Sequence, residues 1–144
     1  MTGAVATGIA LVFFWLGLVV AISFIEAPLK FQAPGITIPL GLGIGRLVFR
    51  ALNSVEGVLA VVLIVLAVVG DGWPVAAYAG LGVAVAALAA QVGAVRPALS
   101  KRTDAVLADP ENVPEHRSRV HLWYVGFEVI KVAALLTAGV SLLV

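Results

Sequence analysis

Four stretches of the chain are each long and apolar enough to cross a lipid bilayer, because a membrane-spanning helix needs roughly 20 predominantly apolar residues. These stretches are residues 4–25, 51–70, 73–95 and 120–144. They do not alternate apolar and polar residues, as the strands of a membrane barrel would. The sequence therefore predicts an all-α membrane protein, an antiparallel bundle of four transmembrane helices that forms a single domain over residues 1–144.

The composition agrees with a chain whose solvent is lipid. Hydrophobic residues make up 62% of the 144 residues and charged residues only 12%, whereas a soluble domain typically has about 25% charged residues. The absence of cysteine excludes disulfides, thiolate metal sites and thiol nucleophiles. A net charge of +1 gives no reason to expect nucleic-acid binding. The partner that the composition predicts is the lipid bilayer.

The positions of the basic residues predict the orientation. Eight of the nine Lys and Arg residues fall in the first and third connections between the predicted spans: Lys30, Arg46, Arg50, Arg96, Lys101, Arg102, Arg117 and Arg119. Cytoplasmic connections carry an excess of basic residues. We therefore expect a multi-pass protein of the bacterial inner membrane with both termini on the outer side. The first fifteen residues contain no Lys or Arg, so we expect the N-terminal stretch to remain as a span and not to be a signal peptide.

The three connections differ in character. Asp71 and Gly72 predict a tight turn that makes the second and third spans a hairpin. The segment 32–45 is rich in glycine and proline and is interpreted as a re-entrant or interfacial loop, too flexible for a regular helix. The segment 100–119 mixes charges of both signs, which predicts a solvated connector with a short amphipathic helix over residues 100–108.

The third span contains two rows of small residues at intervals of four. The first row is Ala76, Gly80 and Ala84, and the second is Gly82, Ala86, Ala90 and Ala94. Small residues let membrane helices approach closely. We interpret the rows as helix-packing surfaces, with a homo-oligomer contact as the alternative. Trp15, Phe13 and Phe14 are interpreted as lipid-facing or packing residues.

Polar residues inside the spans gather in the predicted cytoplasmic half of the bundle. Charged groups at membrane depth are costly and by default indicate function. On the fourth span the polar residues His121, Tyr124, Glu128 and Lys131 fall at positions i, i+3, i+7 and i+10, which places them on one helical face. The candidate ligand-binding residues are Glu26, Asn53, Glu56, Gln91, His121, Tyr124, Glu128 and Lys131.

Three functions are compatible with this pattern. The first is a site for a proton, a cation or a small solute, coupled to transport, in which Glu56, Glu128 and Lys131 carry the binding and Glu26 and His121 lie at the mouth. A metal would use Glu56, Glu128 and His121, but Glu128 follows His121 by seven residues and Lys131 repels a cation, so a proton or small ion suits the site better. The sequence identifies no cofactor.

The second function is a structural or accessory subunit of a membrane complex, whose buried polar network fixes helix packing. The third is a membrane-embedded enzyme acting on a lipid-soluble substrate, with His121 or Glu128 as general base and Lys131 as electrostatic partner. The sequence contains no nucleophile elbow and no phosphate-binding loop to support it. We therefore expect a non-enzymatic function.

Three segments carry a resemblance to known families: residues 23–31, residues 45–56 and residues 121–131. The chain resembles small four-span bacterial inner-membrane proteins of unknown function. It is more distantly similar to the transmembrane protein 205 family, through its Ser-Phe, Ala-Pro, Phe and Gly-Arg pattern, and less so to DoxX-like proteins, which also begin their second span with a Glu. The resemblance implies a four-helix bundle and loose associations with metal or drug resistance and with redox partners. It implies no role for Glu26 or Glu128.

Overall fold

The computed structural model describes residues 1–113 and 119–144, and within these residues the chain is helical and contains no strand. Four of the helical stretches are long and apolar enough to cross a membrane: Gly3–Gln32, Ile38–Val69, Val75–Ala108 and Arg119–Leu143. The predicted all-α class and the four candidate spans are confirmed. Arg117 and Glu115, which belong to the predicted third connection, lie outside the described residues.

Two of the four stretches are composite. The first consists of α1 (Gly3–Val19), the π-helix η1 (Val20–Glu26), α2 (Ala27–Leu29) and the 3-10 helix η2 (Lys30–Gln32). The third consists of α4 (Val75–Ala90), the π-helix η3 (Gln91–Val95) and α5 (Arg96–Ala108). The second and fourth are the single helices α3 (Ile38–Val69) and α6 (Arg119–Leu143).

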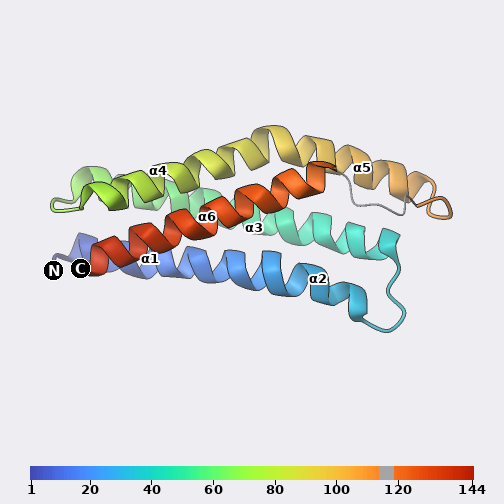
Figure 1. Cartoon of the computed structure of the whole chain (residues 1–144), viewed down its shortest axis with the longest axis horizontal. Helices are drawn as coiled ribbons and strands as arrows, with labels where there is room; N and C mark the ends of the chain where they lie inside the picture. Colours follow the sequence, from blue (N-terminus) through green and yellow to red (C-terminus); the bar gives the residue numbers. More distant parts are fainter. Residues whose placement is uncertain (114–118) are drawn as a thin grey trace.

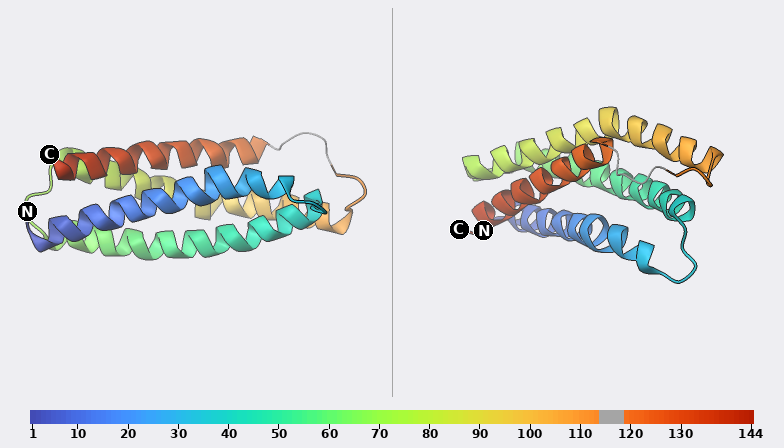
Figure 2. Two further views of the ribbon diagram at one scale, coloured as in Figure 1. Left: turned by 90° about the horizontal axis from the view of Figure 1, so that it is seen from below. Right: turned by 45° about the vertical axis from the view of Figure 1, so that its right-hand side comes forward.

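The helices lie side by side along the longest axis of the molecule (Figures 1 and 2). Both termini and the connection 70–74 lie at one end, and the connection 33–37 lies at the other, together with the end of α5 (Figure 1). We call this second end the basic end, because Arg46, Lys101 and Arg102 lie there. Helix α6 packs against α1 and α4, and α1 packs against α3.

The interior is apolar over most of its length, and so is the outer surface. Val12, Leu63 and Leu135 are fully buried in one continuous core. Large apolar side chains such as Val58 and Val68 are exposed on the outside of the bundle. An apolar exterior of this extent is what a lipid-facing bundle requires, since lipid tails replace water as the solvent.

The interpretation of residues 32–45 as an irregular loop is wrong from Ile38 onward, where α3 begins. The Thr37 hydroxyl accepts a hydrogen bond from the Leu40 backbone N–H at 3.2 Å and caps this helix. Pro39 lies in the first turn, where a missing N–H does no harm. Gly45 lies under the Lys30 side chain, where a Cβ would come within 3.0 Å of Nζ. Gly45 therefore allows close packing against the segment that contains Lys30, and it does not make the chain flexible here.

The helix that contains the predicted third span does not end at residue 95 but continues to Ala108. The amphipathic helix predicted over residues 100–108 is present as the second half of α5. The ribbon bends where η3 joins α5 (Figure 1). Pro97 lies in the first turn of α5, and a proline ring inside a helix clashes with the carbonyl four residues earlier. A π-helical turn relieves such a clash without breaking the helix.

The short second connection is confirmed as a turn. Residues 70–74 are not helical, and Gly72 has φ +86°, the left-handed region that favours glycine. Helices α3 and α4, which this turn joins, contact each other. Trp73 is buried at the end of the turn.

The two rows of small residues have different surroundings. Gly80 and Ala84 of the first row are buried, and Gly80 lies against Ala134 and Ala138 of α6. In the second row Gly82 and Ala86 are exposed. The packing interpretation holds for Gly80 and Ala84 but not for the exposed Ala76, and self-association through the second row stays a prediction.

Gly80 provides a test of this packing. A Cβ at Gly80 would lie 2.6 Å from the backbone oxygen of Ala134, which cannot move away easily, whereas a Cβ at Gly82 would meet nothing within 4 Å. We expect Gly80→Ala to lower the free energy of unfolding by about 1–3 kcal/mol and Gly82→Ala to leave it unchanged or slightly higher. Thermal unfolding in detergent measures both, and equal effects would contradict this packing.

Candidate functional site

Lys131 is buried between two carboxylates in the interior of the bundle. Its Nζ lies 2.5 Å from Glu56 Oε2 and 2.6 Å from Glu128 Oε1. All three side chains are at most 2% exposed. Because the two carboxylates share one ammonium, these three groups carry a formal charge of −1. Such a charge is stable away from water only when each oxygen and N–H has a partner.

The Glu56 carboxylate has two further donors. The Trp15 indole Nε1 donates to Glu56 Oε2 at 2.7 Å, and Trp15 is fully buried. The Asn53 amide nitrogen donates to Glu56 Oε1 at 3.1 Å, while its oxygen accepts from Arg96 at 2.9 Å. The surrounding donors and acceptors require this orientation of the amide. Asn53 therefore links the buried cluster to a second cation, Arg96.

The Glu128 carboxylate is held by donors from two other helical stretches. The Gln91 Nε2 donates to Glu128 Oε1 at 2.7 Å and to the Tyr124 backbone oxygen at 3.3 Å. The Ser23 hydroxyl donates a hydrogen bond to Glu128 Oε2. Glu128 thus joins α6 to both composite stretches, and Glu56 joins the cluster to α3.

The two donors that reach Glu128 from other helical stretches lie in π-helical segments. Ser23 lies within η1, and Gln91 is the first residue of η3. Each segment ends two residues before a proline, Pro28 and Pro97 respectively. Single π-helical turns inside α-helices are frequent at functional sites. Here they flank one buried carboxylate from two sides.

The structure brings together six of the eight residues predicted to bind a ligand: Asn53, Glu56, Gln91, Tyr124, Glu128 and Lys131. Tyr124 takes part through its backbone oxygen. Its ring packs edge-on against Phe49 with centroids 5.2 Å apart, and its hydroxyl is buried with no hydrogen-bond partner among the described residues.

Glu26 and His121 lie away from the centre of the cluster. Glu26 Oε1 forms an ion pair with Lys30 Nζ at 3.7 Å. Glu26 Oε2 is buried with no hydrogen-bond partner among the described residues. His121 is half-buried in the first turn of α6, about 10 Å along the helix from Glu128.

Three members of the network are absent from the predicted site residues. The sequence indicates a lipid-facing or packing role for Trp15; the packing alternative is right, but the indole N–H also pairs with Glu56. The sequence marks Arg96 only as a basic residue of a connection, and Ser23 only as the first residue of a segment that carries the family resemblance. A buried carboxylate needs several hydrogen-bond donors. The sequence signal for these three residues is therefore that each carries an N–H or O–H donor on another span.

The donor set does not suit a divalent metal. Among residues 1–113 and 119–144, no three His, Cys, Asp or Glu side chains come together as a metal site would require. Lys131 lies between Glu56 and Glu128, where a cation would have to bind.

Comparison with known protein families, curated proteins and solved structures finds no match to this chain.

The charge balance predicts unequal effects of two substitutions. Lys131→Met leaves two carboxylates facing each other without their ammonium, so we expect a loss of roughly 3–5 kcal/mol of stability. Glu56→Gln leaves the neutral pair of Lys131 and Glu128, and the new amide oxygen still accepts from Trp15, so the loss should be clearly smaller. Thermal unfolding of both variants in detergent measures the difference. Equal losses, or a larger loss for Glu56→Gln, would contradict the pairing described above.

Proposed function

We propose that this chain is a multi-pass protein of the bacterial inner membrane that binds and releases a proton at Glu128, and that this proton is coupled to transport of a small ion or solute. The observation that carries the proposal is the hydrogen bond between Ser23 and Glu128 at the edge of the buried cluster.

The charge of the cluster favours a proton over a metal cation. Glu56, Glu128 and Lys131 sum to −1, and adding one proton makes this group neutral inside the bundle. A metal would have to displace Lys131, which contacts both carboxylates. A proton needs only a free lone pair and a neighbour that can accept a hydrogen bond from it.

Ser23 is the neighbour that meets this requirement. Trp15, Lys131 and the amide nitrogens of Asn53 and Gln91 can only donate to the carboxylate oxygens that they face. A hydroxyl both donates and accepts, so Ser23 can reverse its hydrogen bond when Glu128 Oε2 takes up a proton. The proton is therefore best accommodated on Glu128 Oε2, beside the only hydroxyl among these hydrogen-bond partners.

Glu26 supports a route between this proton and the basic end. It follows Ser23 by three residues on the same helical stretch. Its buried Oε2 lacks a hydrogen-bond partner among the described residues, and Lys30 holds its other oxygen. The route would run from Glu26 past Ser23 to Glu128, all on the predicted cytoplasmic side.

We expect a protonated carboxylic acid in the infrared spectrum of the lipid-reconstituted protein, seen as a C=O stretch that titrates with pH. Glu128→Gln should remove the band, because it removes the acid that binds the proton. Ser23→Ala should shift the band and its titration midpoint, because it removes the hydroxyl that accepts from the acid. The matched control is Glu111→Gln, which removes a carboxylate from an exposed position outside the cluster and should leave the band unchanged.

A titrating band that survives in Glu128→Gln would contradict the assignment to Glu128. Wild-type protein without any titrating carboxylic acid would leave the cluster as a packing device and favour the structural or accessory role.

The orientation is tested separately. We expect both termini outside and the basic end in the cytoplasm, because basic connections stay on that side. The chain contains no cysteine, so single cysteines at Thr2 and Lys101 can be labelled without background. A membrane-impermeant maleimide should label the cysteine at position 2 in intact spheroplasts and the one at position 101 only after lysis. The reverse pattern would overturn the proposed orientation.

A further inference from the structure

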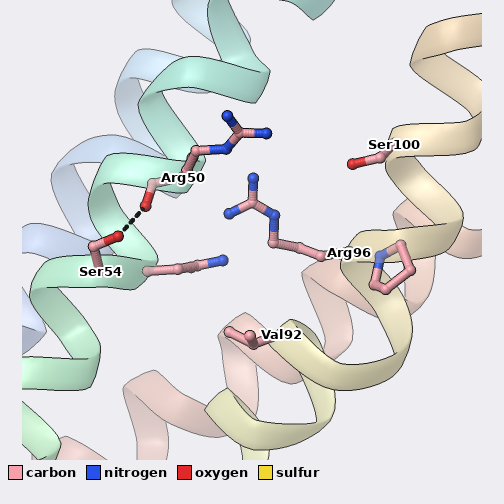
Figure 3. A pocket seen from close by; sticks show the side chains of 7 residues that line it. Arg50, Ser54, Val92, Arg96 and Ser100 are labelled. Atoms are coloured by element: carbon pink, nitrogen blue, oxygen red, sulfur yellow. Dashed lines mark hydrogen bonds between the residues drawn. The ribbon is translucent and has the colours of Figure 1, made fainter.

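Two guanidinium groups converge in a pocket between α3 and α5, next to the buried cluster, whose Asn53 also lines the pocket (Figure 3). The pocket has a volume of about 490 Å³ and opens to the surface of the bundle. Arg50 enters it from α3 and Arg96 from α5, and in Figure 3 their side chains point toward each other. Ser54 and Ser100 add hydroxyl groups to the same lining.

The described residues supply no acidic partner for these two arginines. The nearby Asp104 carboxylate pairs with Arg46 at 2.6 Å. The bonds that Arg96 makes go to neutral acceptors, the Asn53 amide oxygen at 2.9 Å and the Arg46 backbone oxygen at 3.5 Å. Two adjacent like charges repel each other, and an anion between them would remove this repulsion.

The position of the pocket matches the depth of a lipid headgroup. Arg50 and Arg96 stand where the long apolar runs of α3 and α4 end, which is the boundary of the hydrocarbon region. Val92 and Pro97 form apolar parts of the lining. Basic pockets between membrane helices on the cytoplasmic side bind phosphate-bearing lipid headgroups.

We propose that the pocket of Arg50 and Arg96 binds a phosphate group, which a guanidinium holds through paired N–H donors. The two sources of this chemistry at the basic end are the phosphate of an anionic lipid and a small phosphate ester in solution. The pocket is distinct from the proton site and its occupancy does not rest on the proposal for Glu128. Asn53 joins the two sites, since its amide contacts Glu56 on one side and Arg96 on the other.

Three probes separate the possible sources. Phosphatidylglycerol carries both phosphate and acyl chains, diacylglycerol carries only the chains, and glycerol phosphate carries only the phosphate. Native mass spectrometry of the detergent-purified protein, with a thermal-unfolding series for each probe, gives the affinities. We expect phosphatidylglycerol to bind one per chain and to raise the unfolding temperature, and diacylglycerol to do neither. Binding of glycerol phosphate as tight as that of phosphatidylglycerol identifies a soluble ester as the source, and weaker binding identifies the lipid.

The variant that tests the site is Arg50→Gln, because Arg50 is exposed and takes no part in the buried cluster. We expect it to weaken phosphate binding roughly tenfold or more, the loss of one charged hydrogen-bonding partner. Arg50→Lys should recover part of the affinity. The matched control is Arg119→Gln, which removes the same charge from an exposed position outside the pocket lining.

Three results would overturn the proposal: equal affinity in wild type, Arg50→Gln and Arg119→Gln; binding of diacylglycerol as tight as that of phosphatidylglycerol; or no binding of any phosphate probe. Circular dichroism is the folding control for Arg50→Gln. We expect the same helical content as in wild type, so that a loss of affinity is not due to a loss of fold.

Discussion

The ammonium of Lys131, enclosed between the carboxylates of Glu56 and Glu128, is the interaction on which the rest of the structure depends. Ionised groups inside an apolar bundle are tolerated only when each has partners at close range. Trp15 and Ser23 on the first helical stretch, Asn53 on α3 and Gln91 on the third stretch supply those partners. Because these donors come from different helices, satisfying one cluster of charges also fixes how the helices face each other.

Prolines shape the backbone around this cluster. Pro28 and Pro97 each follow a π-helical turn, η1 or η3, and these turns carry Ser23 and Gln91. The two helices are therefore irregular at the positions from which Ser23 and Gln91 reach Glu128. Arg96, which contacts Asn53 of this cluster, also lines the pocket that we propose to bind phosphate.

The sequence predicted the class of fold and most members of the cluster, because a charge in an apolar span is conspicuous and the periodicity of α6 places Glu128 and Lys131 on one face. It did not predict how far the helices extend. Residues 38–45 look like a loop by their glycines, but Gly45 gives room to Lys30 from another segment. It also missed Trp15 and Arg96 as partners, because neither residue is unusual alone. Their roles follow from hydrogen bonds to residues about forty positions away, which no local pattern encodes.

The most direct test of the shared ammonium is a solid-state NMR measurement on protein reconstituted in lipid, with ¹⁵N in lysine and ¹³C in glutamate side chains. We predict that Lys131 Nζ has the chemical shift of an ammonium and shows dipolar couplings to the carboxyl carbons of both Glu56 and Glu128. Each coupling should disappear in the corresponding Gln variant. A neutral amine at Lys131, or a coupling to only one of the two carboxylates, would contradict the central claim.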